Sequence, residues 1–203
     1  MPETSAAKFD VKKDLRALYA PRAGGWSFVA VPSQQFLMVD GHGDPNTSPL
    51  YPAALEALYG LSYSIKFASK TAGRDYVVAP LEGLWDSDVA DAFVRGDRAL
   101  WRWTMMIAQP DWITEKAVDA ARAAKGITAP RLETLSEGRS LQVLHIGPYA
   151  DEAPTLAQLH NEVMPAEGVT FNGRHHEVYL SDPRKVAPEK LRTVVRQPVR
   201  PAW

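Results

Sequence analysis

Cysteine is absent from this chain of 203 residues. Its absence excludes disulfide bonds, thiolate nucleophiles and zinc sites built on cysteine. No stretch approaches the ~20 consecutive apolar residues of a membrane-spanning helix, and residues 1–15 contain no apolar run of the kind that a signal peptide needs. We therefore expect a soluble, cytoplasmic protein without a membrane partner.

An excess of charge of one sign is also missing, since the formal net charge is -1 and the sequence pI is about 6.5. We therefore expect no nucleic-acid partner, because such partners select basic surfaces. The sequence also lacks a phosphate-binding loop, a GxSxG nucleophile elbow and an HExxH zinc motif. These absences predict that no cofactor and no metal ion is bound.

Hydrophobic residues, by contrast, make up 45% of the chain, and charged residues 23%. This balance supports a sizeable core, and the length fits a single domain over residues 1–203. Six tryptophans are many for this length, and they concentrate in one region that contains Trp85, Trp101, Trp103 and Trp112.

The order of predicted elements repeats along the chain, as strand, helix, strand, strand. The first half, about 34–110, has predicted strands at 36–39, 75–81 and 100–108 and a helix from Ser48 to about residue 67. The second half, about 131–203, has a predicted hairpin of 131–135 and 140–146, a helix at about 152–164, and strands at 175–181 and 191–199. A helix capped by Thr114 connects the halves within residues 111–130.

Short sequence matches support this duplication. Strands end at Gln109-Pro110 and at Gln197-Pro198, and residues 73–78 align with residues 173–178. We therefore predict an α+β fold of two βαββ modules in a pseudo-twofold arrangement. It has one antiparallel sheet, helices on one face and a ligand cleft at the seam between the modules.

Glu177 lies near the centre of the predicted strand "HHEVYLS", among residues that favour burial. It shares one face with Tyr179, because side chains alternate along a strand. The plainer interpretation is a strand acid paired with Arg174 or Arg196. The functional interpretation is a carboxylate in a cleft, which pairs with a cationic ligand or acts as a general base on water. In the alignment above, the apolar Val77 takes its place in the first half.

Aromatic side chains flank the strands that we expect beside Glu177 in the sheet: Tyr76, Trp85, Trp101, Trp103, Tyr149 and Tyr179. As a group they predict the walls of a pocket for flat or cationic ligands. Taken singly, each tryptophan fits the core better than a pocket wall.

Two further sites remain open from the residues alone. Glu82, in "PLEGLW", is either a second acid at the rim of the cleft or a solvated turn residue. His175 and Glu177 share a strand face, and together with His145 they could bind a metal ion. No second cluster of ligands accompanies them, so we favour the interpretation that these histidines face solvent.

Four stretches carry a resemblance to a known family: "PLEGLW" at 80–85, "WRWTMMIAQP" at 101–110, "HIGPY" at 145–149 and the segment 175–199. From about residue 34 to its end, the chain resembles the GyrI-like small-molecule-binding family. The resemblance implies two βαββ modules around a cleft for amphipathic, often cationic, aromatic compounds. In multidrug-responsive regulators of that family, a glutamate deep in the cleft meets the positive charge of the ligand, and Glu177 matches it.

The segment 175–199 is most similar to stand-alone members that hydrolyse cyclopropane-bearing, DNA-alkylating natural products and so protect the cell by detoxification. Under that resemblance Glu177 orients or deprotonates water, Tyr149 or Tyr179 donates to the substrate carbonyl, and Trp85, Trp101 and Trp103 stack on the substrate. Multidrug binding without catalysis remains open. So does a protein-interaction module, because some relatives inhibit a topoisomerase. The sequence leaves the oligomeric state and the physiological ligand undetermined.

Overall fold

The computed structural model describes residues 8–21, 23–89, 92–93 and 95–203. Residues 1–7 of the predicted domain, and residues 22, 90, 91 and 94, lie outside this description. The strands are β1 (Ser27–Val31), β2 (Gln34–His42), β3 (Leu81–Asp86), β4 (Arg102–Gln109), β5 (Arg131–Leu135), β6 (Gly138–Ile146), β7 (Val169–Phe171), β8 (His175–Tyr179) and β9 (Arg192–Pro201). The helices are α1 (Val11–Asp14), α2 (Arg16–Tyr19), α3 (Leu50–Thr71), α4 (Glu115–Lys125), α5 (Ala153–Gln158) and α6 (Met164–Ala166), with a π-helical segment, Leu159–Val163, between α5 and α6.

The described strands form one sheet in the order β1-β6-β9-β8-β3-β4-β2-β5, with β7 added to β9. All strand pairs along this order are antiparallel. One module consists of β2, α3, β3 and β4, the other of β6, α5–α6, β8 and β9, and they join where β3 pairs with β8. The predicted α+β fold of two βαββ modules is confirmed.

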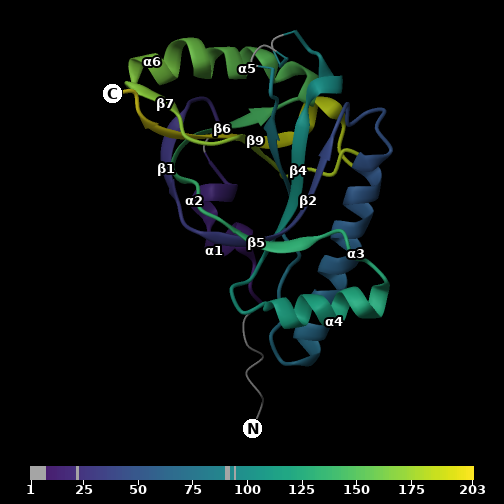
Figure 1. The fold of residues 1–203 in the computed structure, drawn as a ribbon. Helices are drawn as coiled ribbons and strands as arrows, with labels where there is room; N and C mark the ends of the chain where they lie inside the picture. Colours follow the sequence, from purple (N-terminus) through teal and green to yellow (C-terminus); the bar gives the residue numbers. More distant parts are fainter. Residues whose placement is uncertain (1–7, 22, 90–91, 94) are drawn as a thin grey trace.

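The sheet curls strongly (Figure 1). Strands that are far apart in the strand order of the sheet can therefore follow one another directly along the chain. β1, at one edge, runs into β2 after two residues, and β5, at the other edge, runs into β6 after two residues. The predicted hairpin of 131–135 with 140–146 is wrong. Instead β5 pairs with β2, and β6 pairs with β1 and β9. The turn signal at "SEG" marks a bend between two strands that pair with different partners.

The first-module strand predicted at 75–81 is also misplaced. Residues 75–80 make only an isolated bridge, between Tyr76 and Phe9, and the strand itself begins at Leu81. β3 is therefore the counterpart of β8 in element order, and the alignment of 73–78 with 173–178 is wrong. Val77 is accordingly not the structural counterpart of Glu177.

The long helix α3 and the connecting helix α4 begin close to their predicted starts. Thr114 caps α4 by accepting a hydrogen bond from the backbone N–H of Ala117, and Gly126 ends the helix with φ 65°, a left-handed conformation that glycine adopts without strain. α3 begins at Leu50, just after the predicted cap. Its buried Leu58, Leu61 and Ile65 follow the helical period and join the main core.

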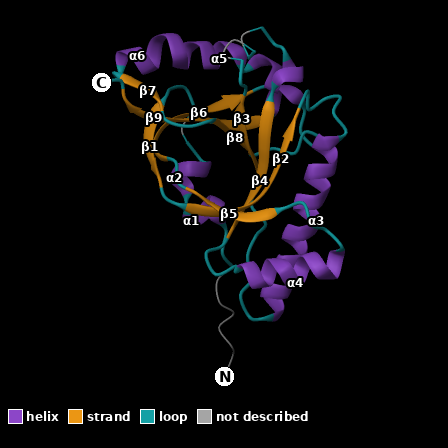
Figure 2. Ribbon diagram, viewed as in Figure 1, coloured by secondary structure: helices purple, strands orange, loops and turns teal. Residues whose placement is uncertain are grey.

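The two faces of the sheet are covered by different helices, and Figure 2 shows α3 and α5–α6 flanking the sheet while α1 and α2 lie within its curve. We call the face that carries Glu177 the helical face, because α3 and α5 cover it. We call the opposite face, which α2 covers, the inner face. In the described part of the chain, no helix combines the length and apolar character that crossing a membrane would require.

Candidate functional site

Glu177 lies in the middle of β8, at the seam between the two modules. It pairs with Gly83 of β3 on one side and with Val195 of β9 on the other. A Cβ atom on Gly83 would lie 2.9 Å from the indole nitrogen of Trp85 and 3.1 Å from the hydroxyl of Tyr179. The glycine therefore leaves the space in which these two side chains meet beside Glu177.

Both carboxylate oxygens of Glu177 have partners on the same sheet face. Nε2 of His175 lies 3.1 Å from Oε1, and the hydroxyl of Tyr179 donates to Oε2 at 2.7 Å. The indole N–H of Trp85 donates in turn to the Tyr179 hydroxyl oxygen at 3.0 Å. Burial opposes ionisation of Glu177, but the contacts with His175 and Tyr179 outweigh it and lower its pKa. Glu177 is therefore an anion at neutral pH, although only 13% of its side chain is exposed.

Glu152, which sequence reasoning missed, is a second buried acid beside Glu177. It precedes α5 and makes no capping hydrogen bond with that helix. Burial first, and then the negative charge of Glu177, raise its pKa to about 9. Its Oε1 and the nearby Thr193 Oγ1 are buried with no hydrogen-bond partner among the described residues. An acid at the start of a helix is an ordinary sequence feature, so no local signal distinguishes Glu152.

The two carboxyl groups therefore hold different protonation states near neutral pH. Glu177 is ionised and Glu152 carries a proton, because two neighbouring buried carboxyl groups resist simultaneous ionisation. A proton acceptor and a proton donor are thus held side by side, which is the arrangement that general acid–base chemistry uses.

Two tyrosines from different helical segments extend the site. Tyr149 packs edge-on against Tyr179, with ring centroids 5.5 Å apart, and is 39% exposed. Burial, followed by the charges of Glu152 and Glu177, raises the pKa of Tyr149 to about 12. Tyr51 of α3 was not predicted for the site, yet burial and the charge of Glu177 raise its pKa as well. Both phenols keep their protons at neutral pH and are potential donors.

The predicted tryptophans form a continuous aromatic group on the helical face. Trp85 and Trp103 are paired across β3 and β4, and Trp85 packs edge-on against Trp101, with ring centroids 5.8 Å apart. Trp101 stacks on Phe93 at 4.9 Å. Trp103 is 1% exposed and lies directly over Gly41, where no side chain would fit. The edge of Tyr51 contacts Trp103, so this aromatic group reaches the tyrosines.

Glu82 needs a correction, since it is neither a cleft rim residue nor a solvated one. It pairs with Val178, one residue along from Glu177, so its side chain points to the inner face. There it accepts a hydrogen bond from Tyr19 at 2.7 Å and contacts Nε2 of His176 at 2.9 Å. Glu82 is 1% exposed and belongs to a buried polar network.

Tyr76 is likewise not brought together with Glu177. It is 1% exposed, packs edge-on against Trp112 and donates a hydrogen bond to Gln109. Tyr76 precedes the strand that was predicted to contain it, because that strand begins only at Leu81. Its side chain therefore packs in the core.

The plainer interpretation of Glu177, an ion pair with an arginine, does not fit the described residues. Arg174 donates to Thr104 and lies 3.9 Å from Asp86, while Arg196 lies on the inner face and contacts Glu137. Among the residues that the structure describes, no group of three or more His, Asp or Glu side chains could hold a metal ion.

Two hollows in the surface lie away from Glu177. One, of about 690 Å³, is lined by β6 and the helix from α5 to α6. The other, of about 580 Å³, lies between the first described residues and Trp112. Glu177 lines neither, so the predicted cleft at the seam stays a prediction.

Comparisons with known proteins agree with this architecture. The model of the GyrI-like small molecule binding domain matches residues 26–200. An uncharacterized conserved protein from Listeria innocua is 38% identical, with a TM-score of 0.86 over 95% of this chain and 100% of its own. A hydrolase from Listeria innocua is 37% identical, with a TM-score of 0.84 over 96% and 100% of the two chains.

More distant structures share the fold. The C-terminal domain of EcmrR is 10% identical, with a TM-score of 0.55 over 87% of this chain and 98% of that domain. A search of curated proteins finds no match.

Proposed function

This chain belongs to the GyrI-like small molecule binding domain family, and we propose that it binds amphipathic aromatic molecules beside Glu177 and hydrolyses reactive electrophiles among them. The observation that carries the proposal is the carboxyl pair of Glu177 and Glu152, one ionised and one protonated. A binding protein for cations needs only the anion. A neighbouring acid with a pKa of about 9 adds a proton donor, which suits hydrolysis.

A strained cyclopropane conjugated to a carbonyl is the substrate class that we propose, in agreement with the sequence resemblance. Water attacks a ring carbon, a carbon–oxygen bond forms and a ring carbon–carbon bond breaks. The released electron pair moves to the carbonyl oxygen. Glu177 accepts the proton of the attacking water, and Glu152 or a tyrosine supplies the proton that the carbonyl oxygen takes up. Ring strain supplies much of the driving force, so a base of lowered pKa suffices.

The geometry separates the two tyrosines between which the sequence left the choice open. The single hydroxyl proton of Tyr179 is directed at Glu177 Oε2, 2.7 Å away, so this residue orients the carboxylate. No described hydrogen bond occupies the Tyr149 hydroxyl, and Tyr149 is partly exposed. We therefore assign Tyr149, with Glu152, as the donor toward the substrate.

The aromatic group supplies the binding surface in this proposal. The partly exposed ring of Trp101 is the one that meets the ligand, which favours flat ligands and ligands with a positive charge, while the buried Trp85 and Trp103 hold this ring in place. The buried polar atoms of Glu152 and Thr193 that lack partners are groups that a substrate or its water would satisfy.

Glu177→Gln tests the proposal, because glutamine keeps the shape but is not a base. With a cyclopropane-fused dienone as substrate, we expect turnover to fall by about 10²–10⁴-fold while affinity for the neutral substrate changes little. Absorbance follows the loss of the dienone, and isotopically labelled water identifies the source of the new hydroxyl group. Glu133→Gln, an exposed acid on β5, is the matched control.

Two results would change the assignment. Turnover retained in Glu177→Gln would remove Glu177 as the base. Absence of turnover in the wild-type protein, together with tight binding of a cationic rhodamine dye that weakens in Glu177→Gln, would make the protein a binder of cations without hydrolysis.

A further inference from the structure

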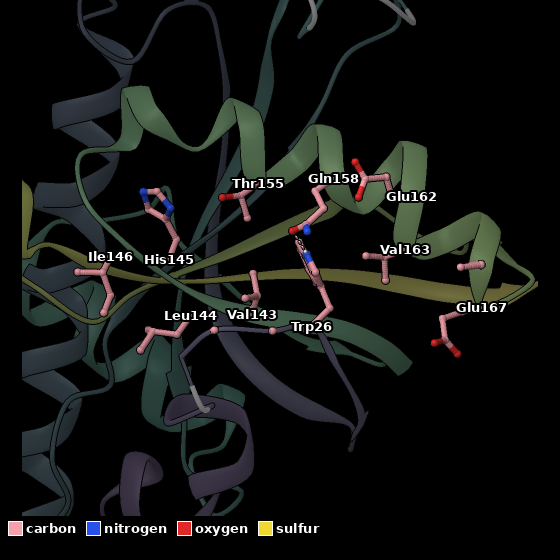
Figure 3. Close-up of a pocket in the computed structure, with 13 residues that line it drawn as sticks. Trp26, Val143, Leu144, His145, Ile146, Thr155, Gln158, Glu162, Val163 and Glu167 are labelled. Carbon is pink, nitrogen blue, oxygen red and sulfur yellow. Dashed lines mark hydrogen bonds between the residues drawn. The ribbon is translucent and has the colours of Figure 1, made fainter.

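A second hollow, separate from Glu177, lies between strand β6 and the helix from α5 to α6 (Figure 3). Its volume is about 690 Å³, within the range of small-molecule sites. One wall is the strand and the opposite wall is the helix, while Trp26 stands between them (Figure 3). None of its lining residues belongs to the carboxyl pair or to the aromatic group described above.

The hollow has a firm apolar base. Trp26 and Val163 pack against a small core cluster that includes Leu141 and Leu159. The indole N–H of Trp26 donates to Gln158 Oε1 at 3.3 Å, which ties the ring to the helix. Because the base is fixed by core packing, a ligand here would meet a preformed surface and lose little free energy in ordering it.

The helix wall departs from regular geometry at this place. Residues Leu159–Val163 are π-helical, and π-helical segments inside α-helices concentrate at functional sites. Leu159, the first residue of this segment, is buried in the core cluster, whereas Glu162 and Val163 line the hollow. The irregular turn thus belongs to the wall of the hollow.

The lining carries negative charge without a balancing positive charge. Glu162 and Glu167 are both exposed, and neither makes an ion pair with a described residue. No lysine or arginine is among the lining residues, whose other polar side chains are His145, Thr155 and Gln158. An apolar base under two carboxylates is complementary to an organic cation with a flat aromatic body.

We propose that this hollow is a second small-molecule site, which takes flat aromatic cations with the ring against Trp26 and the charge toward Glu162 and Glu167. The proposal does not rest on the hydrolysis at Glu177. The two sites share no residue: Glu152, just before α5, interacts with Glu177, whereas Thr155 and Gln158 line the hollow. One chain would then hold two cations.

Equilibrium dialysis with rhodamine 6G tests the number of sites. We expect two per chain in the wild-type protein and one in Glu177→Gln, whereas the double variant Glu162→Gln/Glu167→Gln should keep two sites, one of them weakened. Combined with Glu177→Gln, the double variant should weaken the remaining site by about 5–10-fold, the range expected for the loss of two exposed charge contacts. Trp26→Leu in the same background should weaken it at least as much.

Three controls make the result specific. Glu189→Gln, an exposed acid elsewhere, should leave both sites unchanged. Fluorescein, a flat anion, should not occupy the hollow. The melting temperature of Glu162→Gln/Glu167→Gln should match that of the wild-type protein, because these exposed acids carry no described structural contact.

The absence of any rhodamine 6G site in Glu177→Gln would overturn the proposal. The proposal would also be overturned if Glu177→Gln bound rhodamine 6G with the same affinity before and after Glu162 and Glu167 are replaced by glutamine. These outcomes are independent of turnover at Glu177, so failure of this proposal and failure of the hydrolase proposal are distinguishable.

Discussion

His176 and Glu177 are neighbours in β8, but they serve two polar clusters of opposite character on the two faces of the sheet. On the inner face, both ring nitrogens of His176 contact carboxylates: Nδ1 lies 2.9 Å from Glu137, and Nε2 lies 2.9 Å from Glu82. Arg196 contacts the same Glu137 and donates to the carbonyl of Leu18. On the helical face, Glu177 contacts His175 and stands beside another acid, Glu152, and no arginine of the described residues makes an ion pair with it.

The difference lies in charge balance and in satisfaction of polar atoms. The inner cluster contains two carboxylates and two cations, because the carboxylates raise the pKa of His176 to about 9 despite its burial. The helical-face pair contains two acids, and one of them must remain protonated. One side-chain oxygen each on Glu152 and Thr193 is buried without a hydrogen-bond partner among the described residues. We infer that the inner cluster stabilises the fold and that the outer pair is the site.

Removing one charge from the inner cluster should have the largest effect on stability. In Glu137→Gln, Arg196 would lose its carboxylate partner and His176 would keep only Glu82, and we expect a loss of about 3–5 kcal/mol in the free energy of unfolding. Urea denaturation at pH 7 measures it. Glu133→Gln, an exposed acid whose partner Arg131 is partly exposed, should cost less than about 1 kcal/mol.

The pH dependence sharpens this prediction. His176 has a folded pKa above its unfolded value, so its contribution is present below pH ~6.5 and is lost as the pH rises through about 9. The lowered pKa of Glu137 works in the opposite direction, and its contribution is lost on acidification. Glu137→Gln should flatten both limbs of the stability profile. Equal losses in Glu137→Gln and Glu133→Gln would contradict a structural role for the inner cluster.

Glu152→Gln should have the opposite effect on stability. The folded pKa of Glu152 is raised to about 9, so the folded protein must hold a proton that the unfolded chain releases above pH ~4.3. Holding this proton costs nothing below pH ~4.3, and its cost to the free energy of unfolding grows as the pH rises to about 9. Glutamine removes this cost, and we expect a gain of about 1–3 kcal/mol at pH 8.

The same variant should lose activity. Glutamine cannot transfer the proton that we assign to Glu152, so turnover should fall while the melting temperature rises. Melting temperatures between pH 5 and 9, measured beside turnover, test both parts. A variant that is destabilised at pH 8 would show that Glu152 is a structural acid like those of the inner cluster.

The two tyrosines give the smallest predicted effects and the finest distinction within the site. Tyr149→Phe removes a donor to the substrate, so kcat should fall by about 10-fold and the acid limb of the pH–rate profile should stay in place. Tyr179→Phe removes the hydrogen bond that stabilises ionised Glu177, so the acid limb should move to higher pH. An unmoved acid limb in Tyr179→Phe would mean that its hydroxyl does not support the Glu177 anion.

Features that depend on neighbours in the chain were predictable from the sequence. Alternation along a strand places Tyr179 on the face of Glu177, and the structure confirms this through their hydrogen bond. The cap at Thr114 and the order of elements in both modules were predicted for the same reason. The family was predictable from short stretches of sequence, among them the segment 175–199.

Features that depend on how distant segments meet were not predictable. The register of β3 against β8 decided that Glu82 faces inward and Gly83 faces Glu177, and a shift of one residue would have exchanged them. Glu152 became a partner of Glu177 only because the start of α5 packs onto the helical face. The sequence by itself determined the modules and the position of one acid. Tertiary packing alone decided which second acid stands beside it, because burial and a neighbouring charge, which raise the pKa of Glu152, come from residues distant in the chain.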